Sequence, residues 1–478
     1  MIALHLRAAL AVLLLSLLLI APCLLAPRIQ AGDLSSHIYN AWLARLIDQN
    51  EAPGLYLAPM SSNWLFDVML LNAWKLGGPE FAQRFCVSAS VLIFFWGSFA
   101  LTGVLAGKRP WTVTPILAML SYGWIFHSGF FNYYLSMGFC FWIMALLWIP
   151  SWKAALAALP LALLAFSAHI LPVAIVLGLL AYLWLARALP PRRLPFLLLA
   201  AIVALAAAAW LASRLLTVQW TGRQWILISG ANQFLIFGPK YVAVFLFALF
   251  LWAGLLARYL RSRGWPGAAR DPSLHLLVLC AAAVLILPSG ILPPGMHHPL
   301  LFIPERISLW VAVLLTGIHA GVPWSRGERW LPAILAAVLF SFIGIDWRAL
   351  NRLEDHLERA VASLPPGQRV VNTVSGANAA FNPIVHLIDR VCIRRCFSFA
   401  NYEASTANFR VRALGPNPIV IDNYADSFAL QSGGYVVKPD DFPLYGLFQN
   451  IDGTFFARPF QVGEQISVTT IACPPPYF

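Results

Sequence analysis

The sequence predicts an all-α polytopic membrane protein with about eleven transmembrane helices and a C-terminal extracytoplasmic domain of α/β or α+β type. Of its 478 residues, 60% are hydrophobic and only 11% are charged, whereas a soluble globular domain carries about 25% charged residues. Apolar runs long enough to cross a hydrocarbon core of about 30 Å recur through residues 1–346. Residues 347–478 hold 11 of the 20 acidic residues. We therefore expect a membrane domain followed by a soluble domain.

The first predicted span covers residues 8–27, where Arg7 precedes an apolar stretch of about 19 residues. That stretch is longer than the apolar core of a cleavable signal peptide, so it is interpreted as a retained helix. The other predicted spans are 85–107, 111–127, 135–151, 154–170, 171–187, 195–213, 241–260, 273–292, 307–321 and 330–345.

Basic residues fall in alternate connections between these spans, and the positive-inside rule places such connections in the cytoplasm. The expected protein is an integral membrane protein of the inner or plasma membrane, with its N-terminus cytoplasmic and residues 347–478 outside. A long first external loop (residues 28–84) then lies on the outer face. The net charge of +12 reflects this topology, so it is not taken as a nucleic-acid-binding surface. The basic residues are Arg7, Lys108, Arg109, Lys153, Arg187, Arg192, Arg193, Arg258, Arg261, Arg263, Arg270, Arg326 and Arg329.

The soluble domain is expected to combine a helix with short strands. Residues 351–364 have helical periodicity, and four later runs have the β-rich composition of strands. A domain of roughly 130 residues is large enough to bury a core of its own. The β-rich runs are RVVNTV, NPIVIDNY, GGYVVKP and EQISVTTIAC.

The seven cysteines divide between the two domains. Four lie in apolar spans, where a buried structural thiol is expected: Cys23, Cys86, Cys140 and Cys280. The other three lie in the soluble domain, and an oxidising compartment would allow two of them to pair. Cys392 with Cys396, or either of them with Cys473, are the open alternatives. Zinc is disfavoured, because no cysteines at the usual short spacing and no clustered histidines accompany them.

A polar cluster follows the first span directly, in AGDLSSHIYNAWLARL (residues 31–46). If this stretch is a helix with Asp33 as its N-cap, Asp33, His37 and Asn40 share one face. A carboxylate and an imidazole would then lie together at the membrane surface, where they could do chemistry. The alternative is structural: Asp33 only caps the helix, and His37 satisfies a neighbouring polar group.

Further candidates for substrate binding lie in the short outward-facing segments. Each has a structural alternative: the interfacial aromatic belt for Asn132 and Tyr133, turn formation for His169, and a snorkelling anchor for Arg306. Asp48, Glu51 and Asp67 are interpreted as ordinary solvated or capping acids. The full candidate set for substrate binding is Asn40, Asn132, Tyr133, His169, His297, His298, Glu305 and Arg306.

These segments resemble, distantly, the GT-C fold superfamily of membrane glycosyltransferases, including its protein mannosyltransferases and aminoarabinose transferases. The resemblance lies in GDLSSHIYNAWLA, GFFNYYLSMGFCFWIMALLW, FSAHILP and FIPERISLW, and in a soluble domain after the last span. It implies a hexosyltransferase-type enzyme that moves a sugar from a polyprenyl-phosphate carrier to an acceptor on the outer face. The expected partners are membrane lipid, the lipid-linked donor, and a glycan, lipid or protein acceptor, with no nucleic acid.

The resemblance also implies a catalytic acid in the first external loop, and Asp33 is the candidate for the base that takes the acceptor proton. His37 would orient or assist it. Arg306 is suited to offset the charge of the departing phosphate, with Arg214, Arg223 and Lys240 as weaker options. Many members of the superfamily carry two adjacent acids, whereas Leu34 and two serines follow Asp33 here. No cofactor or metal is therefore predicted, although a divalent metal is left open.

Two other classes of function are weighed against sugar transfer. A transporter or lipid flippase would place ionisable groups near the bilayer midplane, often in repeated halves. The sequence has no acidic residue near the middle of a confident span and no internal repeat. A GT-C-like scaffold without catalysis, acting through its external domain, is the other alternative, and the missing second acid keeps it open.

Overall fold

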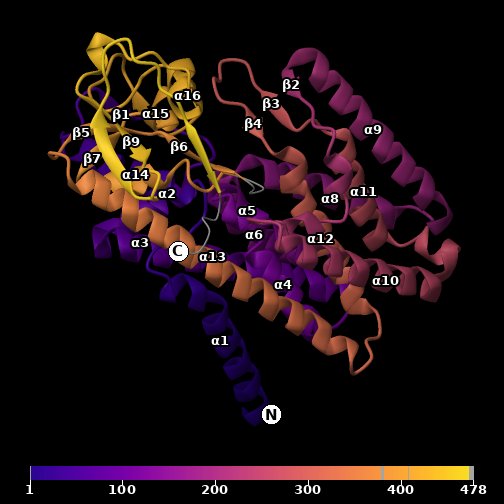
Figure 1. Cartoon of the computed structure of the whole chain (residues 1–478). Helices are drawn as coiled ribbons and strands as arrows, with labels where there is room; N and C mark the ends of the chain where they lie inside the picture. Colours follow the sequence, from indigo (N-terminus) through magenta and orange to yellow (C-terminus); the bar gives the residue numbers. More distant parts are fainter. Residues whose placement is uncertain (1, 378–381, 407, 473–478) are drawn as a thin grey trace.

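The computed structural model describes residues 2–377, 382–406 and 408–472, so Cys473 lies outside the described residues. Figure 1 shows a bundle of helices with the small sheets of the C-terminal region gathered at one end, while α1 (Ile2–Leu25) leads away from the bundle. The sequence correctly predicts this predominance of helices and the sheets of the C-terminal region, but it misses a three-stranded sheet within residues 1–346, formed by β2 (Thr217–Gln219), β3 (Gly290–Leu292) and β4 (Leu300–Leu301).

Six helices in the described part of the chain are long and apolar enough to cross a membrane, which indicates a multi-pass membrane protein. Shorter apolar helices lie between them. One of the six, α3, has non-helical backbone at Gly78 beside Pro79, which kinks it. The six are α1, α3 (Leu65–Ala106), α8 (Ile170–Ala188), α9 (Leu194–Leu215), α10 (Tyr241–Ala268) and α13 (Leu331–Ala362); the shorter ones are α6 (Phe131–Leu146), α7 (Trp152–Ala168) and α11 (Pro272–Ile286).

Helix α12 (Ile303–Gly321) is the buried centre of the bundle. All of its residues except Glu305 and Gly321 are buried, and it packs against α3 and α11. The predicted span 307–321 lies within it. Protein surrounds this helix on most sides, which is why a polar residue such as Arg306 is tolerated in its first turn.

The predicted span 111–127 is wrong. Its residues form a one-turn helix (Trp111–Val113) and two short helices, α4 (Thr114–Ser121) and α5 (Trp124–His127). Tyr122 leaves the helical conformation and Gly123 is extended. At about 1.5 Å per residue, α4 is about 12 Å long, less than half of a hydrocarbon core. The break wraps around Gln233, whose side-chain oxygen accepts a hydrogen bond from the Ile125 amide at 3.3 Å.

No break in the chain separates the last apolar span from the C-terminal region. The predicted span 330–345 and the predicted helix 351–364 form one continuous helix, α13, about 48 Å long. Asp346, where the sequence places the domain boundary, is buried within it. Its carboxylate accepts hydrogen bonds from Lys240 Nζ at 2.5 Å and from the Tyr241 hydroxyl at 2.7 Å.

The C-terminal region contains a four-stranded mixed sheet in the order β10-β9-β5-β7 and a parallel β6–β11 pair. Two predicted strands, RVVNTV and EQISVTTIAC, are thereby confirmed, because β5 covers most of the first and β11 lies in the second. The strands are β5 (Gln368–Asn372), β6 (Val374–Ala377), β7 (Cys396–Ser398), β9 (Leu444–Gln449), β10 (Phe455–Pro459) and β11 (Thr469–Ala472).

The other two predicted strands are wrong. NPIVIDNY has no strand: the Asn417 side chain accepts a hydrogen bond from the Ile419 amide, and Asn423 caps α16 (Tyr424–Ser432). Such local asparagine bonds compete with a strand ladder. GGYVVKP contributes only an isolated bridge between Val436 and Gln465.

The first loop, residues 28–84, folds together with the C-terminal region. Strand β1 (Leu55–Leu57) pairs antiparallel with β8 (Val411–Ala413), and α2 (Leu34–Asp48) packs against α14 (Leu387–Cys392). Trp42 stacks on Phe397 with ring centroids 5.7 Å apart. Cys392 and Cys396 form a disulfide beside this contact, one of the pairings that the sequence left open, and the four cysteines of the apolar helices are free and buried as predicted.

Candidate functional site

The side chain of Asp33 does not make the helix-capping hydrogen bond that its position at the start of α2 suggests. Asp33 is the N-cap of α2, as predicted, yet its side chain accepts no capping hydrogen bond. It is 28% exposed, and its ion-pair contact is with His386, whose Nε2 lies 3.7 Å from Asp33 Oδ1. No hydrogen bond to this carboxylate is formed by any residue in the described part of the chain. A ligand can therefore take the hydrogen bonds that a cap would have used.

Backbone contacts with the turn before α6 hold Asp33 in place. The Gly32 amide donates to the His127 carbonyl at 2.7 Å, and the Asp33 amide donates to the Ser128 carbonyl at 3.1 Å. Gly129 has φ +83°, and a Cβ atom there would lie 2.3 Å from the Asp33 nitrogen. Only glycine permits both the conformation and the close approach.

Replacing Gly129 with alanine is expected to destabilise the protein by about 1–3 kcal/mol and to displace Asp33. The cause is the clash with the Asp33 backbone, added to a positive φ that alanine resists. Thermal unfolding of the purified protein in detergent measures the loss. Gly178→Ala in α8 is the matched control, because nothing lies within 4 Å of the added methyl group. Equal melting temperatures for the two variants would contradict this account.

His37, predicted as the partner of Asp33, is instead bound to Asp67. His37 Nδ1 lies 2.7 Å from Asp67 Oδ1, and the Asn132 side-chain amide donates to Asp67 Oδ2 at 2.9 Å. Asn132 in turn accepts a hydrogen bond from the Phe66 amide at 2.9 Å. Burial lowers the pKa of His37, but attraction by Asp67 outweighs it and raises the pKa to about 9. Asp67, interpreted from sequence as an ordinary acid, thus lies within the site.

The C-terminal region contributes a second histidine–aspartate pair, which the sequence analysis missed. His386 Nδ1 lies 2.9 Å from Asp389 Oδ2, while Ser398 Oγ donates to Asp389 Oδ1 at 2.5 Å. Burial disfavours the protonated imidazole, but the hydrogen bond and charge of Asp389, reinforced by Asp33, raise the pKa of His386 above its usual value. His386 is thereby held with Nε2 toward Asp33.

Two further polar residues of the C-terminal region, Tyr402 and Glu403, lie near enough to Asp33 to feel its charge. Glu403 is buried and accepts a hydrogen bond from Ser36 Oγ at 3.2 Å. Burial raises the pKa of Glu403 to about 8, with the attraction of His37 opposing it. The Tyr402 ring lies 5.4 Å from the His386 ring, and burial followed by the negative charge of Asp33 raises the pKa of Tyr402. Both residues belong to FSFANYEASTANFRVRA, in which no site residue was predicted.

Arg306 lies under the same region. Its guanidinium is 4.0 Å from the centroid of the Phe130 ring and 5.0 Å from that of Tyr133, and its Nε donates to the Leu301 carbonyl at 3.1 Å. The Tyr133 hydroxyl donates to the Arg306 carbonyl at 2.8 Å. Asp33 acts electrostatically on Arg306, as it does on His37, His298 and His386. This electrostatic effect is what links Arg306 to Asp33, because no hydrogen bond or ion pair joins the two among the described residues. We call Asp33, His37, Asp67, Arg306, His386, Tyr402 and Glu403 together the Asp33 site.

The remaining candidates have separate places. His298 lies among the rings of Tyr402, Phe409 and Tyr424, and burial lowers its pKa. His169 caps α8, because its Nδ1 accepts the Leu171 amide at 3.1 Å, and its ring contacts Tyr133.

Other candidates are used elsewhere or exposed. Asn40 accepts a hydrogen bond from Asn401 at 2.9 Å, so its amide joins α2 to the C-terminal region. His297 is exposed. Lys240 is paired with Asp346, and Arg214 lies over the Trp210 ring. Glu305, which precedes Arg306 in the chain, has a buried Oε2 atom that finds no hydrogen-bond partner among the described residues.

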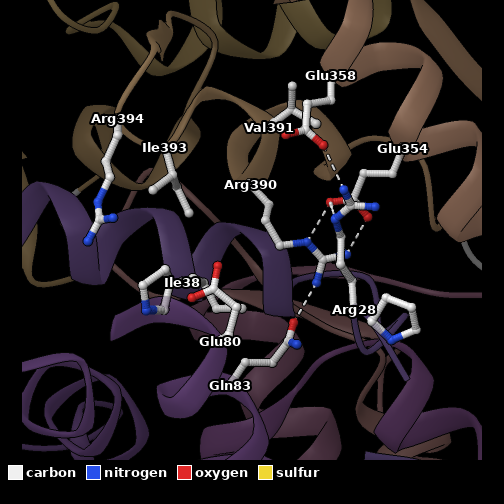
Figure 2. A pocket seen from close by; sticks show the side chains of 12 residues that line it. Arg28, Ile38, Glu80, Gln83, Glu354, Glu358, Arg390, Val391, Ile393 and Arg394 are labelled. Carbon is white, nitrogen blue, oxygen red and sulfur yellow. Dashed lines mark hydrogen bonds and ion pairs between the residues drawn. The ribbon is translucent and has the colours of Figure 1, made fainter. Parts of the chain in front are cut away.

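Arg390 of the C-terminal region forms an ion pair with Glu354 and a hydrogen bond with Gln83, and we call these contacts the ion-pair joint. Arg390 makes two hydrogen bonds to Glu354 on α13, at 2.7 and 2.6 Å, and also donates to Gln83 on α3 and to the Ile29 carbonyl. Figure 2 shows Arg390 extended between Glu354 and Gln83, with Arg28 alongside. These side chains line a polar cavity of about 220 Å³. One arginine of the C-terminal region thus joins α3, α13 and the first loop.

The raised pKa values of His37 and Glu403 predict that the free energy of unfolding falls as pH rises. His37 and Glu403 both bind protons more tightly in the folded state, with pKa values of about 9 and about 8. A raised folded pKa stabilises at low pH, so stability should fall across about pH 4.5–8 for Glu403 and about pH 6.5–9 for His37. Melting temperatures measured across this range test it. Glu403→Gln should flatten the first part of the fall, and a rise with pH would overturn the assignment.

No protein-family model matches the chain, and neither a curated protein nor a solved structure is significantly similar to it. Within the described residues, no group of three or more His, Cys, Asp or Glu side chains is arranged to hold a metal ion.

Proposed function

We propose that the protein is an integral-membrane glycosyltransferase of GT-C type, which moves a sugar from a polyprenyl-phosphate carrier to a hydroxyl-bearing acceptor. The observation that carries the proposal is the Asp33 carboxylate: it makes no capping hydrogen bond, is partly exposed, and lies 3.7 Å from the His386 ring nitrogen. In this proposal the N-terminus is cytoplasmic, and the Asp33 site and the C-terminal region face the outside.

The arrangement suits general-base catalysis of group transfer. An acceptor hydroxyl would donate its hydrogen bond to Asp33, which takes the proton as the oxygen attacks the anomeric carbon. The bond between that carbon and the phosphate oxygen breaks, and the electron pair leaves with the phosphate. Arg306 supplies a fixed positive charge for the developing phosphate, and its burial strengthens that effect. His37 is engaged with Asp67, so it acts in positioning.

The membrane location supports a lipid-linked donor. Arg306 lies at the start of α12, between aromatic rings at the end of the bundle where the polar first loop begins. A phosphate reaching it from the bilayer would keep its hydrocarbon chain among apolar helices. Substrate transport would need no free carboxylate base in this position.

Transfer of radiolabelled hexose from a panel of polyprenyl-phosphate-linked donors, by the purified protein in proteoliposomes, tests the proposal. The expected result is a covalent glycosylated product that requires Asp33. Movement of the lipid or sugar across the membrane of sealed vesicles, with no covalent product, would contradict the transferase proposal and indicate a transporter.

A further inference from the structure

An apolar groove of about 1010 Å³ lies between α1, α4 and α13. Figure 1 shows α1 standing away from the bundle on this face. Leucines of α1, including Leu18, form one wall, and small residues of α13, including Ala333 and Ala337, form the other. The side chains of Leu18 and Leu25 are 71% and 82% exposed, so nothing in the described chain covers them. In a membrane, lipid would fill this space.

One end of the groove is cationic. Arg348, Arg352 and Asp355 line it, and Asp355 is already paired with Arg28 at 2.6 Å. Arg348 Nε donates to the Gly344 carbonyl of its own helix. No carboxylate of the described residues forms an ion pair with Arg348 or Arg352. The groove therefore has apolar walls along its length and, at one end, the positive charges of Arg348 and Arg352.

A wall separates this groove from the Asp33 site. Trp347 lines the groove and donates its Nε1 hydrogen to His127 Nε2 at 3.2 Å. His127 is fully buried, and its carbonyl accepts the Gly32 amide on the other side. A headgroup at Arg348 and Arg352 is thus kept from Asp33 and Arg306. The occupant of the groove is not the molecule that would react at Asp33.

We propose that the groove binds one anionic phospholipid, with its phosphate on Arg348 and Arg352 and its acyl chains along α1 and α13. Between Ala333 and Arg348, α13 rises about 22 Å, which exceeds the about 15 Å depth of one leaflet. The bound chains support Trp347 and, through His127, the backbone that holds Asp33. The proposal goes beyond sugar transfer and does not rest on it.

Native mass spectrometry of the delipidated full chain, titrated with phosphatidylglycerol or phosphatidylcholine, tests the proposal. We expect one tightly held phosphatidylglycerol and markedly weaker phosphatidylcholine binding. At about 1 kcal/mol per basic residue, Arg348→Gln with Arg352→Gln should weaken phosphatidylglycerol binding roughly 30-fold. Arg192→Gln with Arg193→Gln, which removes two exposed charges elsewhere, should leave it unchanged. Ala337→Trp, which fills the groove, should weaken binding of either lipid.

Several outcomes would overturn the proposal. Equal affinity for the two phospholipids, or unchanged phosphatidylglycerol binding in the Arg348 and Arg352 variant, would remove the cationic end as its cause. Preferential binding of polyprenyl phosphate would make the groove a substrate channel. A dimer that forms in place of lipid binding would make it an interface between copies. None of these readouts involves sugar transfer, so they leave the transferase proposal to its own test.

Discussion

Asp33→Asn is expected to lower sugar transfer by roughly 10²–10⁴-fold, the usual contribution of a positioned general base. The amide keeps the size and shape of the carboxylate but cannot take the acceptor proton. Because the Asp33 side chain caps no backbone amide, the change should cost little stability. Initial rates in proteoliposomes and a melting curve of the same preparation measure the two effects.

Asp48→Asn is the matched control for this prediction. Asp48 ends the same helix, α2, and its carboxylate pairs with the exposed Lys75 at 3.3 Å. Its removal should change neither rate nor melting temperature. Full activity of Asp33→Asn would eliminate Asp33 as the base, while loss of activity with an equal loss of folding would reduce it to a structural residue.

The largest stability effect is expected at the ion-pair joint. Arg390→Ala should destabilise the protein by up to about 3–5 kcal/mol, because Glu354 is only 1% exposed and would keep only Arg28 at 3.6 Å and Gln30 at 3.0 Å as partners among the described residues. The C-terminal region should then loosen from α13 and the first loop. Thermal unfolding and limited proteolysis near residue 363 report the two consequences.

Two further variants sharpen this test. Lys438→Ala breaks an exposed pair with Asp426 and should cost at most about 1 kcal/mol. Replacing Arg390 and Glu354 together with methionine should cost less than Arg390→Ala alone, since the buried carboxylate that loses its main partner is removed as well. If Arg390→Ala melts like Lys438→Ala, the joint does not hold the C-terminal region.

Sequence patterns predicted the parts of this structure that depend on local physics. Six of the predicted apolar spans lie in membrane-length helices, because a spanning helix needs only sufficient length and apolar composition. The predicted spans 135–151, 154–170 and 273–292 fall instead on the shorter helices α6, α7 and α11. Asp33 was placed correctly at the start of α2, since N-cap preference is local. The span 111–127 failed because hydropathy averages over Tyr122 and Gly123, where the backbone turns around Gln233.

The contacts between residues of the Asp33 site could not be predicted from local sequence patterns. Asp67 lies 30 residues from His37 and His386 lies 353 residues from Asp33, and nothing in the spacing of either pair indicates contact. Asn132 was found through its motif, although its role as a hydrogen-bond donor to Asp67 was not. Histidines and acids scattered through the C-terminal region carried no periodic signal, so only the fold brings them to Asp33.

The pairing of β1 with β8 delays the folding of the first loop during biosynthesis. Leu57 pairs with Val411, so the first loop cannot complete its ladder until about 350 further residues have been made. At about 5–20 residues per second, that interval is roughly 20–70 s. During this interval the first loop lacks its β8 partner. A nascent chain stopped before residue 386 would therefore carry Asp33 without His386, Tyr402 and Glu403, so the site is completed only late in synthesis.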